Sequence, residues 1–270
     1  MADMDNKVLV SVAPVAATDK VIIPEKIAED VLQCYKAGAA MVHLHVRDRE
    51  GNLTPDMSLL EETLRLIRKD SDIIIEVSTG GVSSLTIEER CAPLYSDLVE
   101  ACSLNVGSTN LGKSVYANPI DDVEYCVREI LKQKKTPEVE TFEIGHTWTM
   151  QELMRKYEFV SPVLFSIVLG HEGESPATPQ ALAAMIQMIP EGALWGITHA
   201  RRKDFSLVAG ALGMGAKTVR IGFEDSNYLD PHTQVDSNAP LVAKTVSLLH
   251  AMDKEAMTPD EARAYFRISR

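Results

Sequence analysis

Ala40-Met41-Val42-His43-Leu44-His45-Val46 is a short apolar run that carries two histidines at alternate positions. Its apolar and β-branched residues predict a buried strand. Strand alternation then predicts both imidazoles on one face and Leu44 on the other. Seven further runs of this kind recur along the chain, with helical patterns between them, at residues 8–13, 73–77, 101–106, 139–144, 163–169, 193–198 and 218–223.

The gaps between these runs leave room for crossover helices, which parallel strands need. Eight β-then-α units are typical of a closed (β/α)8 barrel. The sequence therefore predicts an α/β fold, a single (β/α)8 TIM barrel, with residues 1–270 as one catalytic domain. The alternative is an open doubly wound sheet. It would carry a glycine-rich phosphate loop after the first strand, where residues 13–17 are Ala-Pro-Val-Ala-Ala.

Polar side chains lie at or just past the ends of most runs. In a barrel, the carboxyl ends of all strands meet at one mouth, where the active sites of such enzymes lie. We expect the chemistry of this chain at that mouth. The polar residues are His43, His45, Ser78, Thr79, Ser103, Asn105, Glu140, Glu143, Glu224 and Asp225.

His43 and His45 on one strand face suit a divalent metal such as zinc, copper, nickel or iron. Glu224, at the end of the last run, would complete a set of two histidines and one carboxylate with an open position, as in catalytic zinc sites. The alternative is a pair of interior histidines that bond to their neighbours. Arg220 and Asp225, close to Glu224, either serve the site or form an ion pair that holds the barrel closed.

The Ser78-Thr79-Gly80-Gly81 turn offers hydroxyls and approachable backbone N–H groups. Together with Arg220 at the same mouth, it predicts a binding site for a carboxylate. The alternative is a turn that has no ligand.

Composition limits the classes of partner. The net charge of −12 argues against nucleic acid and anionic membrane surfaces as partners. No stretch approaches the length of a membrane span. The four cysteines include no CxxC pair, which indicates reduced thiols, and the first residues do not resemble a signal peptide. We therefore expect a cytoplasmic protein.

The chain resembles the β-keto acid cleavage enzymes, the family of the 3-keto-5-aminohexanoate cleavage enzyme of lysine fermentation. Each matching motif is short, but their order and spacing are specific. They occupy residues 37–39 (AGA), 42–47 (VHLHVR), 77–81 (VSTGG), 103–105 (SLN), 137–140 (PEVE), 168–170 (VLG), 222–225 (GFED), 237–238 (SN) and 258–263 (TPDEAR).

The resemblance implies a homotetrameric barrel with one Zn²⁺ per subunit, held by His43, His45 and Glu224. It implies that Asp225 and Glu140 are the acid–base and orienting carboxylates. It further implies that the substrate's carboxylate and keto groups meet a polar set made of Ser78, Gly81, Ser103, Asn105 and Arg220. Ser103 replaces a threonine of the family and keeps its hydroxyl.

Two loops depart from the family pattern. Thr18 stands where the lysine-fermentation enzyme has a glutamate that meets the substrate's amino group, so we expect Thr18 at the substrate and a substrate that is not cationic. Arg201 and Arg202 follow the seventh run where the family has a Gly-Arg pair. With Lys203 they would meet the phosphates of acetyl-CoA.

The resulting hypothesis is a zinc-dependent enzyme that condenses a β-keto acid with acetyl-CoA, giving acetoacetate and an acyl-CoA through a metal-stabilised enolate. The nearest alternative is a metal-dependent aldolase or β-keto acid decarboxylase that needs no CoA. The third hypothesis is a barrel that binds a metal or metabolite without catalysis.

Overall fold

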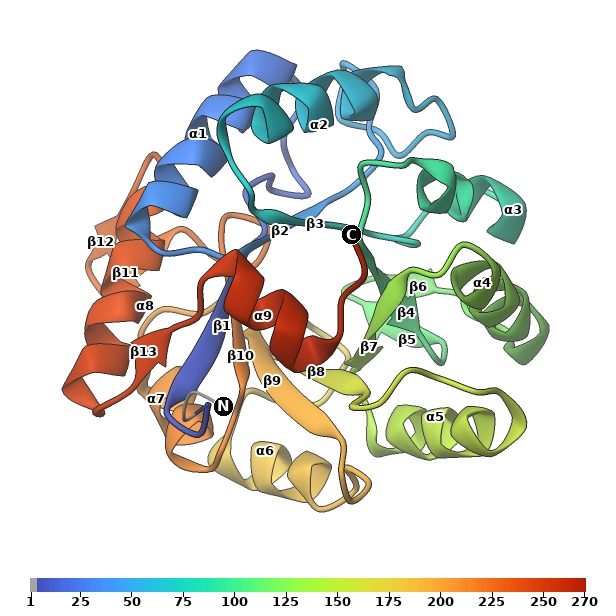
Figure 1. The fold of residues 1–270 in the computed structure, drawn as a ribbon. Coiled ribbons are helices and arrows are strands. Elements are labelled where there is room, and N and C mark those ends of the chain that lie inside the picture. The colour runs from blue at the N-terminus through green and yellow to red at the C-terminus, as the bar shows by residue number, and fades with distance from the viewer. Residues whose placement is uncertain (1–3) are drawn as a thin grey trace.

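The computed structural model describes residues 4–270, and its centre is a closed parallel barrel. The barrel closes because β10 pairs with β9 on one side and with β1 on the other. Figure 1 looks along it, with the strands at the centre and helices around them. The barrel strands are, in order, β1 (Lys7–Val12), β2 (Met41–Leu44), β3 (Ile74–Val77), β4 (Ala101–Asn105), β7 (Thr136–Thr141), β8 (Leu164–Leu169), β9 (Leu194–His199) and β10 (Thr218–Ile221). The predicted (β/α)8 TIM barrel is confirmed.

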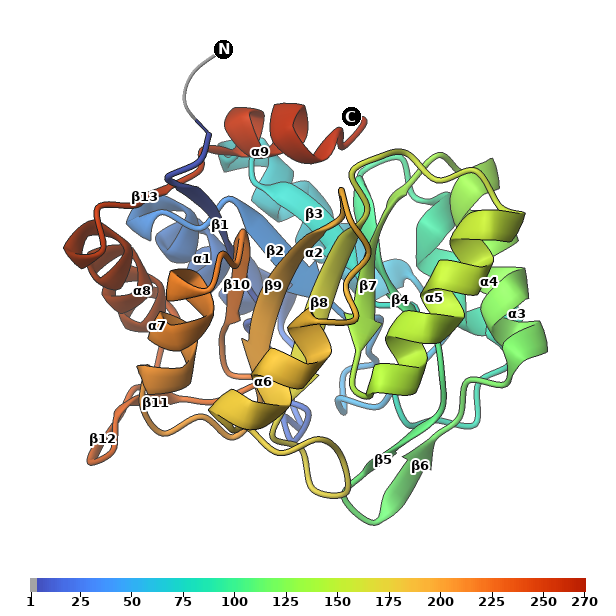
Figure 2. The same cartoon turned by 90° about the horizontal axis from the view of Figure 1, so that it is seen from below.

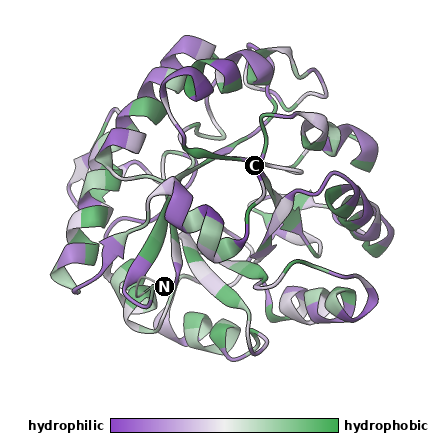
Figure 3. Ribbon diagram, viewed as in Figure 1, coloured by the Kyte–Doolittle hydropathy of each residue, from purple (hydrophilic) through white to green (hydrophobic). Residues whose placement is uncertain are grey.

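Helices form the outer ring and bury one face each against the strands. Figure 3 shows hydrophilic and hydrophobic residues alternating along them, as amphipathic packing requires. No helix of residues 4–270 has the length and apolar content needed to cross a membrane. The helices are α1 (Pro24–Ala37), α2 (Ser58–Asp70), α3 (Ile87–Arg90), the 3₁₀ helix η1 (Ala92–Tyr95), α4 (Ile120–Lys132), α5 (Ile144–Lys156), α6 (Pro179–Ile186), α7 (Ser206–Gly213), α8 (Ala239–Ala251) and α9 (Pro259–Phe266).

The fifth barrel strand begins and ends three residues earlier than predicted. Pro137 lies inside β7, opposite Cys102 of β4, although it has no N–H to donate. Glu143 is the extended residue before α5, so the strand has already ended there. The apolar run at 139–144 therefore spans the end of a strand and the start of a helix.

The last barrel strand ends at Ile221, and a turn follows at Gly222. Gly222 has a φ of 146°, a backbone conformation that residues other than glycine rarely adopt. A Cβ at this position would also lie 2.2 Å from the carbonyl oxygen of Ala13. The Glu224 N–H then donates to that same oxygen, at 3.1 Å. Close contact with the end of β1 thus fixes where Glu224 lies.

Two ends of the barrel differ in character. Figure 2 shows α9 across one end and the hairpin of β5 (Thr109–Leu111) and β6 (Ser114–Tyr116) projecting at the other. Two further short pairings, β11 (Tyr228–Asp230) with β12 (Thr233–Gln234) and β13 (Glu255–Ala256) with β1, lie outside the barrel. The sequence patterns did not predict the hairpins, β13 or α9.

The end of the barrel under α9 is apolar and is closed by charge pairs at its rim. Phe266 of α9 packs with Leu9, Met41 and Ile74 from the strands. Arg263 of α9 is buried and pairs with Glu100 and Asp72, through contacts of 2.6 and 2.8 Å. This end therefore has a structural role, and the mouth is left for chemistry.

We predict that Arg263→Leu lowers the free energy of unfolding by about 3 kcal/mol, because removing one partner leaves Glu100 buried with less compensation. Urea denaturation measures the change. Arg65→Leu is the matched control, since Arg65 pairs with Glu61 on the exposed face of α2, and it should cost less than about 1 kcal/mol. Equal effects of the two variants would contradict the structural role of Arg263.

Candidate active site

Above the apolar end, the barrel interior is lined by polar and charged side chains. Strand register sets His43 beside Glu76, Ser103 beside Glu138, and Glu140 beside Ser166, and all six are buried. Buried charges persist only when they are paired or bonded. The interior is therefore a site built for polar chemistry and does not continue the hydrophobic core.

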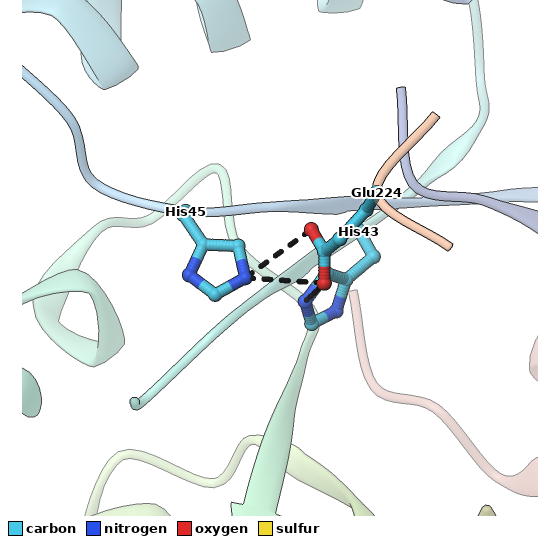
Figure 4. Close-up of side chains that lie close together, drawn as sticks. All are labelled: His43, His45 and Glu224. Atoms are coloured by element: carbon cyan, nitrogen blue, oxygen red, sulfur yellow. Dashed lines mark hydrogen bonds and ion pairs between the residues drawn. The ribbon is translucent and has the colours of Figure 1, made fainter. Parts of the chain in front are cut away.

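His43, His45 and Glu224 converge at the mouth, from β2 and from the turn after β10 (Figure 4). His45 Nε2 lies 3.3 Å from Glu224 Oε2, and His43 Nε2 lies 3.9 Å from Glu224 Oε1. One ligand atom from each residue falls within 4.8 Å of the other two. The three residues that the sequence singled out are thus brought together.

The spacing of these atoms fits a divalent ion. Two ligand atoms about 2.0–2.1 Å from a tetrahedral zinc are about 3.3 Å apart, close to the distance between His45 Nε2 and the Glu224 carboxylate. The same distance is long for a direct hydrogen bond. Imidazole nitrogen and carboxylate oxygen are also the donors that catalytic zinc sites use. The residues present therefore fit the metal that the resemblance implies.

A second carboxylate supports His43 from behind. Glu76 Oε2 lies 3.4 Å from His43 Nδ1, on the side of the ring that faces away from Glu224. Histidines that hold metals usually turn their other nitrogen to such a group, which fixes the ring. Burial, followed by the nearby charge of Glu140, raises the pKa of Glu76 to about 8. Glu138, its bonded neighbour, also has a pKa well above its usual range because it is buried.

Arg220 lies at the centre of three carboxylates. Its Nε and Nη2 donate to Asp225 at 3.1 and 2.8 Å, and its Nη1 donates to Glu140 at 2.9 Å. Glu224 is 3.4 Å from Nη2. Burial opposes ionisation of Glu224, but the charges of His45 and Arg220 hold its pKa well below its usual range.

The balance of charge in this group also favours a divalent cation. One guanidinium among three carboxylates leaves two negative charges in a buried volume. Such an excess is costly unless a cation compensates it. An ion of charge +2 beside Glu224 would neutralise the cluster.

The Ser78–Gly81 turn is held in place from the barrel interior. Ser103 is fully buried and forms two hydrogen bonds with Thr79. The Thr79 N–H donates to the Ser103 hydroxyl at 3.3 Å, and the Thr79 hydroxyl donates to the Ser103 carbonyl at 2.7 Å. Asn105 donates to Glu140 at 3.0 Å. Ser103 and Asn105 were expected to contact the substrate; Ser103 supports the Ser78–Gly81 turn and Asn105 supports Glu140.

A cavity of about 640 Å³ opens at the mouth, between the group of His43, His45 and Glu224 and the β5–β6 hairpin. Leu111 and Tyr116 of that hairpin form part of its wall, and His171 after β8 forms another part. The predicted site residues on the wall are His43, His45, Ser78, Gly81, Glu140, Arg220 and Glu224. Asp225 is buried behind Arg220 and is not among the wall residues.

Three residues that were predicted to contact a ligand lie outside the cavity wall; they are Thr18, Arg201 and Arg202. Thr18 is exposed and outside the cavity lining, whereas Ala17 and Lys20 of the same loop are on the wall. Arg201 is exposed, as a phosphate contact requires. Arg202 is only 1% exposed, with its guanidinium 4.0 Å from the centre of the Phe205 ring, so a phosphate arriving at the surface does not reach it.

Sequence reasoning missed several residues of the site. Glu76 could have been found, because a charged residue inside the run Ile-Ile-Ile-Glu-Val needs a buried partner. Arg47 continues the alternation of His43 and His45 by one more step. Lys20 and His171 carry no local signal, since each lies in a loop that only the fold brings to the cavity.

Residues 13–268 match the family model described as beta-keto acid cleavage enzyme. This chain belongs to that family. It is therefore an enzyme, and the resemblance noted in its motifs is confirmed.

Relatives in the family differ in substrate. The 3-keto-5-aminohexanoate cleavage enzyme of Fusobacterium nucleatum subsp. nucleatum is 34% identical, over 88% of this chain and 87% of the relative. The 3-oxoadipate:acetyl-CoA acetyltransferase of Cupriavidus necator is 28% identical, over 91% of this chain and 88% of the relative. By their names, the first acts on an amino keto acid and the second on a dicarboxylic keto acid. Membership alone therefore leaves the substrate class open.

The fold also resembles a solved structure. The apo structure of ObcA superposes with a TM-score of 0.76 at 19% identity, covering 92% of this chain and 65% of that chain. This likeness concerns the fold alone and agrees with the barrel described above.

We predict that His43→Ala and Glu224→Gln each weaken zinc binding by more than 100-fold, because loss of a ligand exceeds the 10–100-fold cost of losing a supporting contact. Elemental analysis after dialysis against zinc measures the bound metal, and circular dichroism checks the fold. His250→Ala, on the exposed face of α8, is the control that should keep the metal. Retention of stoichiometric zinc by both site variants would contradict the assignment.

Proposed function

We propose that this enzyme converts a β-keto acid and acetyl-CoA into acetoacetate and the acyl-CoA of the remaining chain. The observation that carries the proposal is the convergence of His43, His45 and Glu224 on the same cavity as Arg220. The membership of the chain in the β-keto acid cleavage family supports it, as does a relative named for acetyl-CoA transfer.

His43, His45 and Glu224 would hold the ion, which we propose to be zinc. A divalent ion in this place supplies Lewis-acid stabilisation of negative charge that develops on a keto oxygen. Arg220, the Ser78 hydroxyl and the Gly81 backbone would bind the substrate's carboxylate and so fix the reacting carbon.

Asp225 is the proposed base that removes the proton beside the ketone. It adjoins Glu224 in sequence and is held through both oxygens by Arg220. Glu140 is the proposed orienting carboxylate, because one of its oxygens accepts from Arg220 and the other from Asn105. Arg220 thus connects the base, the orienting group and the substrate.

After loss of its proton, the carbon between the keto and carboxylate groups (C2) would attack the acetyl thioester and expel the CoA thiolate. The thiolate would then add to the substrate's own keto carbon (C3), and cleavage of the C2–C3 bond would release the new acyl-CoA and acetoacetate, whose C2 takes the proton back. Arg201 is the exposed cation proposed to meet the phosphates of CoA at the mouth. Its backbone N–H donates to the Asp225 carbonyl at 2.7 Å, which holds this loop beside the site. We further propose that the enzyme works as a homotetramer, as the resemblance implies, and in the cytoplasm, as the four cysteines without a CxxC pair suggest.

We predict that acetoacetate forms from a panel of β-keto acids only when acetyl-CoA is present, because acetoacetate takes its acetyl group from the thioester. A coupled assay with and without acetyl-CoA measures this. Product formation that ignores acetyl-CoA would identify an aldolase or decarboxylase instead. Absence of product from every acid in the panel would contradict the proposal as a whole.

We predict that Asp225→Asn lowers kcat by 10²–10⁴-fold, as expected for loss of a general base. Glu140→Gln should act mainly on KM, since it loosens Arg220 and leaves the base in place. Steady-state kinetics separate the two parameters, and Asp236→Asn on an exposed loop serves as the control. The opposite pattern, with kcat lost in Glu140→Gln alone, would transfer the base role to Glu140.

A further inference from the structure

Two cations on the cavity wall, Lys20 and Arg47, have no acidic partner within residues 4–270. They differ in this respect from Arg220, which is surrounded by Glu140, Asp225 and Glu224. The wall therefore holds positive charge beyond that of the carboxylate cluster. The proposed reaction does not use this additional positive charge.

Arg47 lies just past β2, two residues after His45, and forms an isolated bridge with Leu53. His43, His45 and Arg47 occupy alternate positions in the sequence, and all three line the cavity. Arg47 is 8% exposed, and its Nη1 donates to the Gly51 carbonyl at 2.8 Å. Its buried Nε has no partner within the described chain.

A guanidinium this deeply buried normally has a carboxylate or phosphate beside it. Within the described part of the chain, the Gly51 carbonyl is the one acceptor that Arg47 contacts. Its remaining donors can therefore be satisfied by an anion that enters the cavity.

Lys20 lies next to Arg47 through the backbone of Gly51. A Cβ at Gly51 would lie 1.9 Å from the Asp19 carbonyl oxygen and 3.5 Å from the Lys20 Cα, so the two loops are in direct contact. The Ile22 N–H also donates to the Arg49 carbonyl at 3.0 Å. The loop after β1 and the loop after β2 thus form one continuous wall that carries both cations.

We infer that Lys20 and Arg47 form a second anion-binding site in this cavity, and that the substrate is a β-keto acid with a second acidic group at its far end. The inference rests on the proposed function and specifies its substrate class. Arg220 and the Ser78 turn take the carboxylate next to the reacting carbon, and Lys20 with Arg47 takes the distal one. Arg47 follows His45 by two residues, which can span at most about 7 Å of chain, and both line the same cavity, so a short dicarboxylic acid can extend from one to the other.

The phosphates of CoA offer the same chemistry as a distal carboxylate. The burial of Arg47 favours the smaller group, because a pyrophosphate carries more bulk and more hydration into a nearly closed position. The exposed Arg201 is the cation proposed to meet a ligand that extends outside the cavity. Kinetics with two acids and with acetyl-CoA distinguish a distal carboxylate from the phosphates of CoA.

The test compares 3-oxoadipate with 3-oxohexanoate, which have the same carbon chain and differ in a terminal carboxylate against a methyl group. We expect kcat/KM to be at least about tenfold higher for 3-oxoadipate, as one charged hydrogen bond provides. Lys20→Met should reduce this ratio about tenfold. Lys26→Met, an exposed lysine on α1 outside the cavity wall, should leave it unchanged.

A binding measurement that needs no turnover accompanies the kinetics. Titration calorimetry with adipate and hexanoate, the unreactive analogues, should give tighter binding of adipate to the wild type and a smaller difference in Lys20→Met. This arm decides the second site even if no acid in the functional assay is turned over, so failure of the inference and failure of the proposed function are distinct results.

Two outcomes would overturn the inference while leaving the proposed function intact. One is equal kcat/KM for the two acids together with equal binding of adipate and hexanoate. The other is a rise in the KM for acetyl-CoA in Lys20→Met, of the same size with either acid, since the wall would then bind the phosphates of CoA.

Discussion

Arg220 and the carboxylates around it could not be buried separately, and this mutual dependence organises the mouth of the barrel. The guanidinium satisfies both oxygens of Asp225, one oxygen of Glu140 and part of Glu224. A lone charge in this position would have to be neutralised or expelled. Arg220 and its three carboxylates stabilise one another, and the net negative charge that remains favours binding of a divalent cation.

Closure of the barrel converts this electrostatic constraint into a site. His45 and Glu224 are 179 residues apart in sequence, yet they meet because β10 pairs with β1 and β1 pairs with β2. The turn at Gly222 then positions Glu224, since close contact between Gly222 and Ala13 sets the direction of the residues that follow. Glu76 then fixes one imidazole from below. The pairing of β10 with β1 is the link that an open sheet would lack.

The sequence predicted the barrel and the histidine pair because both depend on local patterns, and it predicted Glu224 beside that pair because the strand ends of a barrel meet at one mouth. Apolar β-branched runs identify the strands, and the spacing of His43 and His45 identifies one face of a strand. The end of β7 was missed because an apolar run says nothing about where a strand becomes a helix. The predicted contact through Thr18 lies two residues from Lys20, which the loop actually turns to the cavity. The depth of Arg202 depends on how its loop folds over Phe205, which no linear pattern encodes.

The double pairing of β1 has a consequence for the order in which the molecule forms on the ribosome. One edge of this strand finds β2 soon after synthesis begins, but the other waits for β10, near the end of the chain. Until then, a row of amide and carbonyl groups beside Leu9 and Val10 is open to any passing strand. Nascent chains of this protein are therefore vulnerable at their oldest segment, and holding that edge apart from other polypeptides is the task that a chaperone would perform.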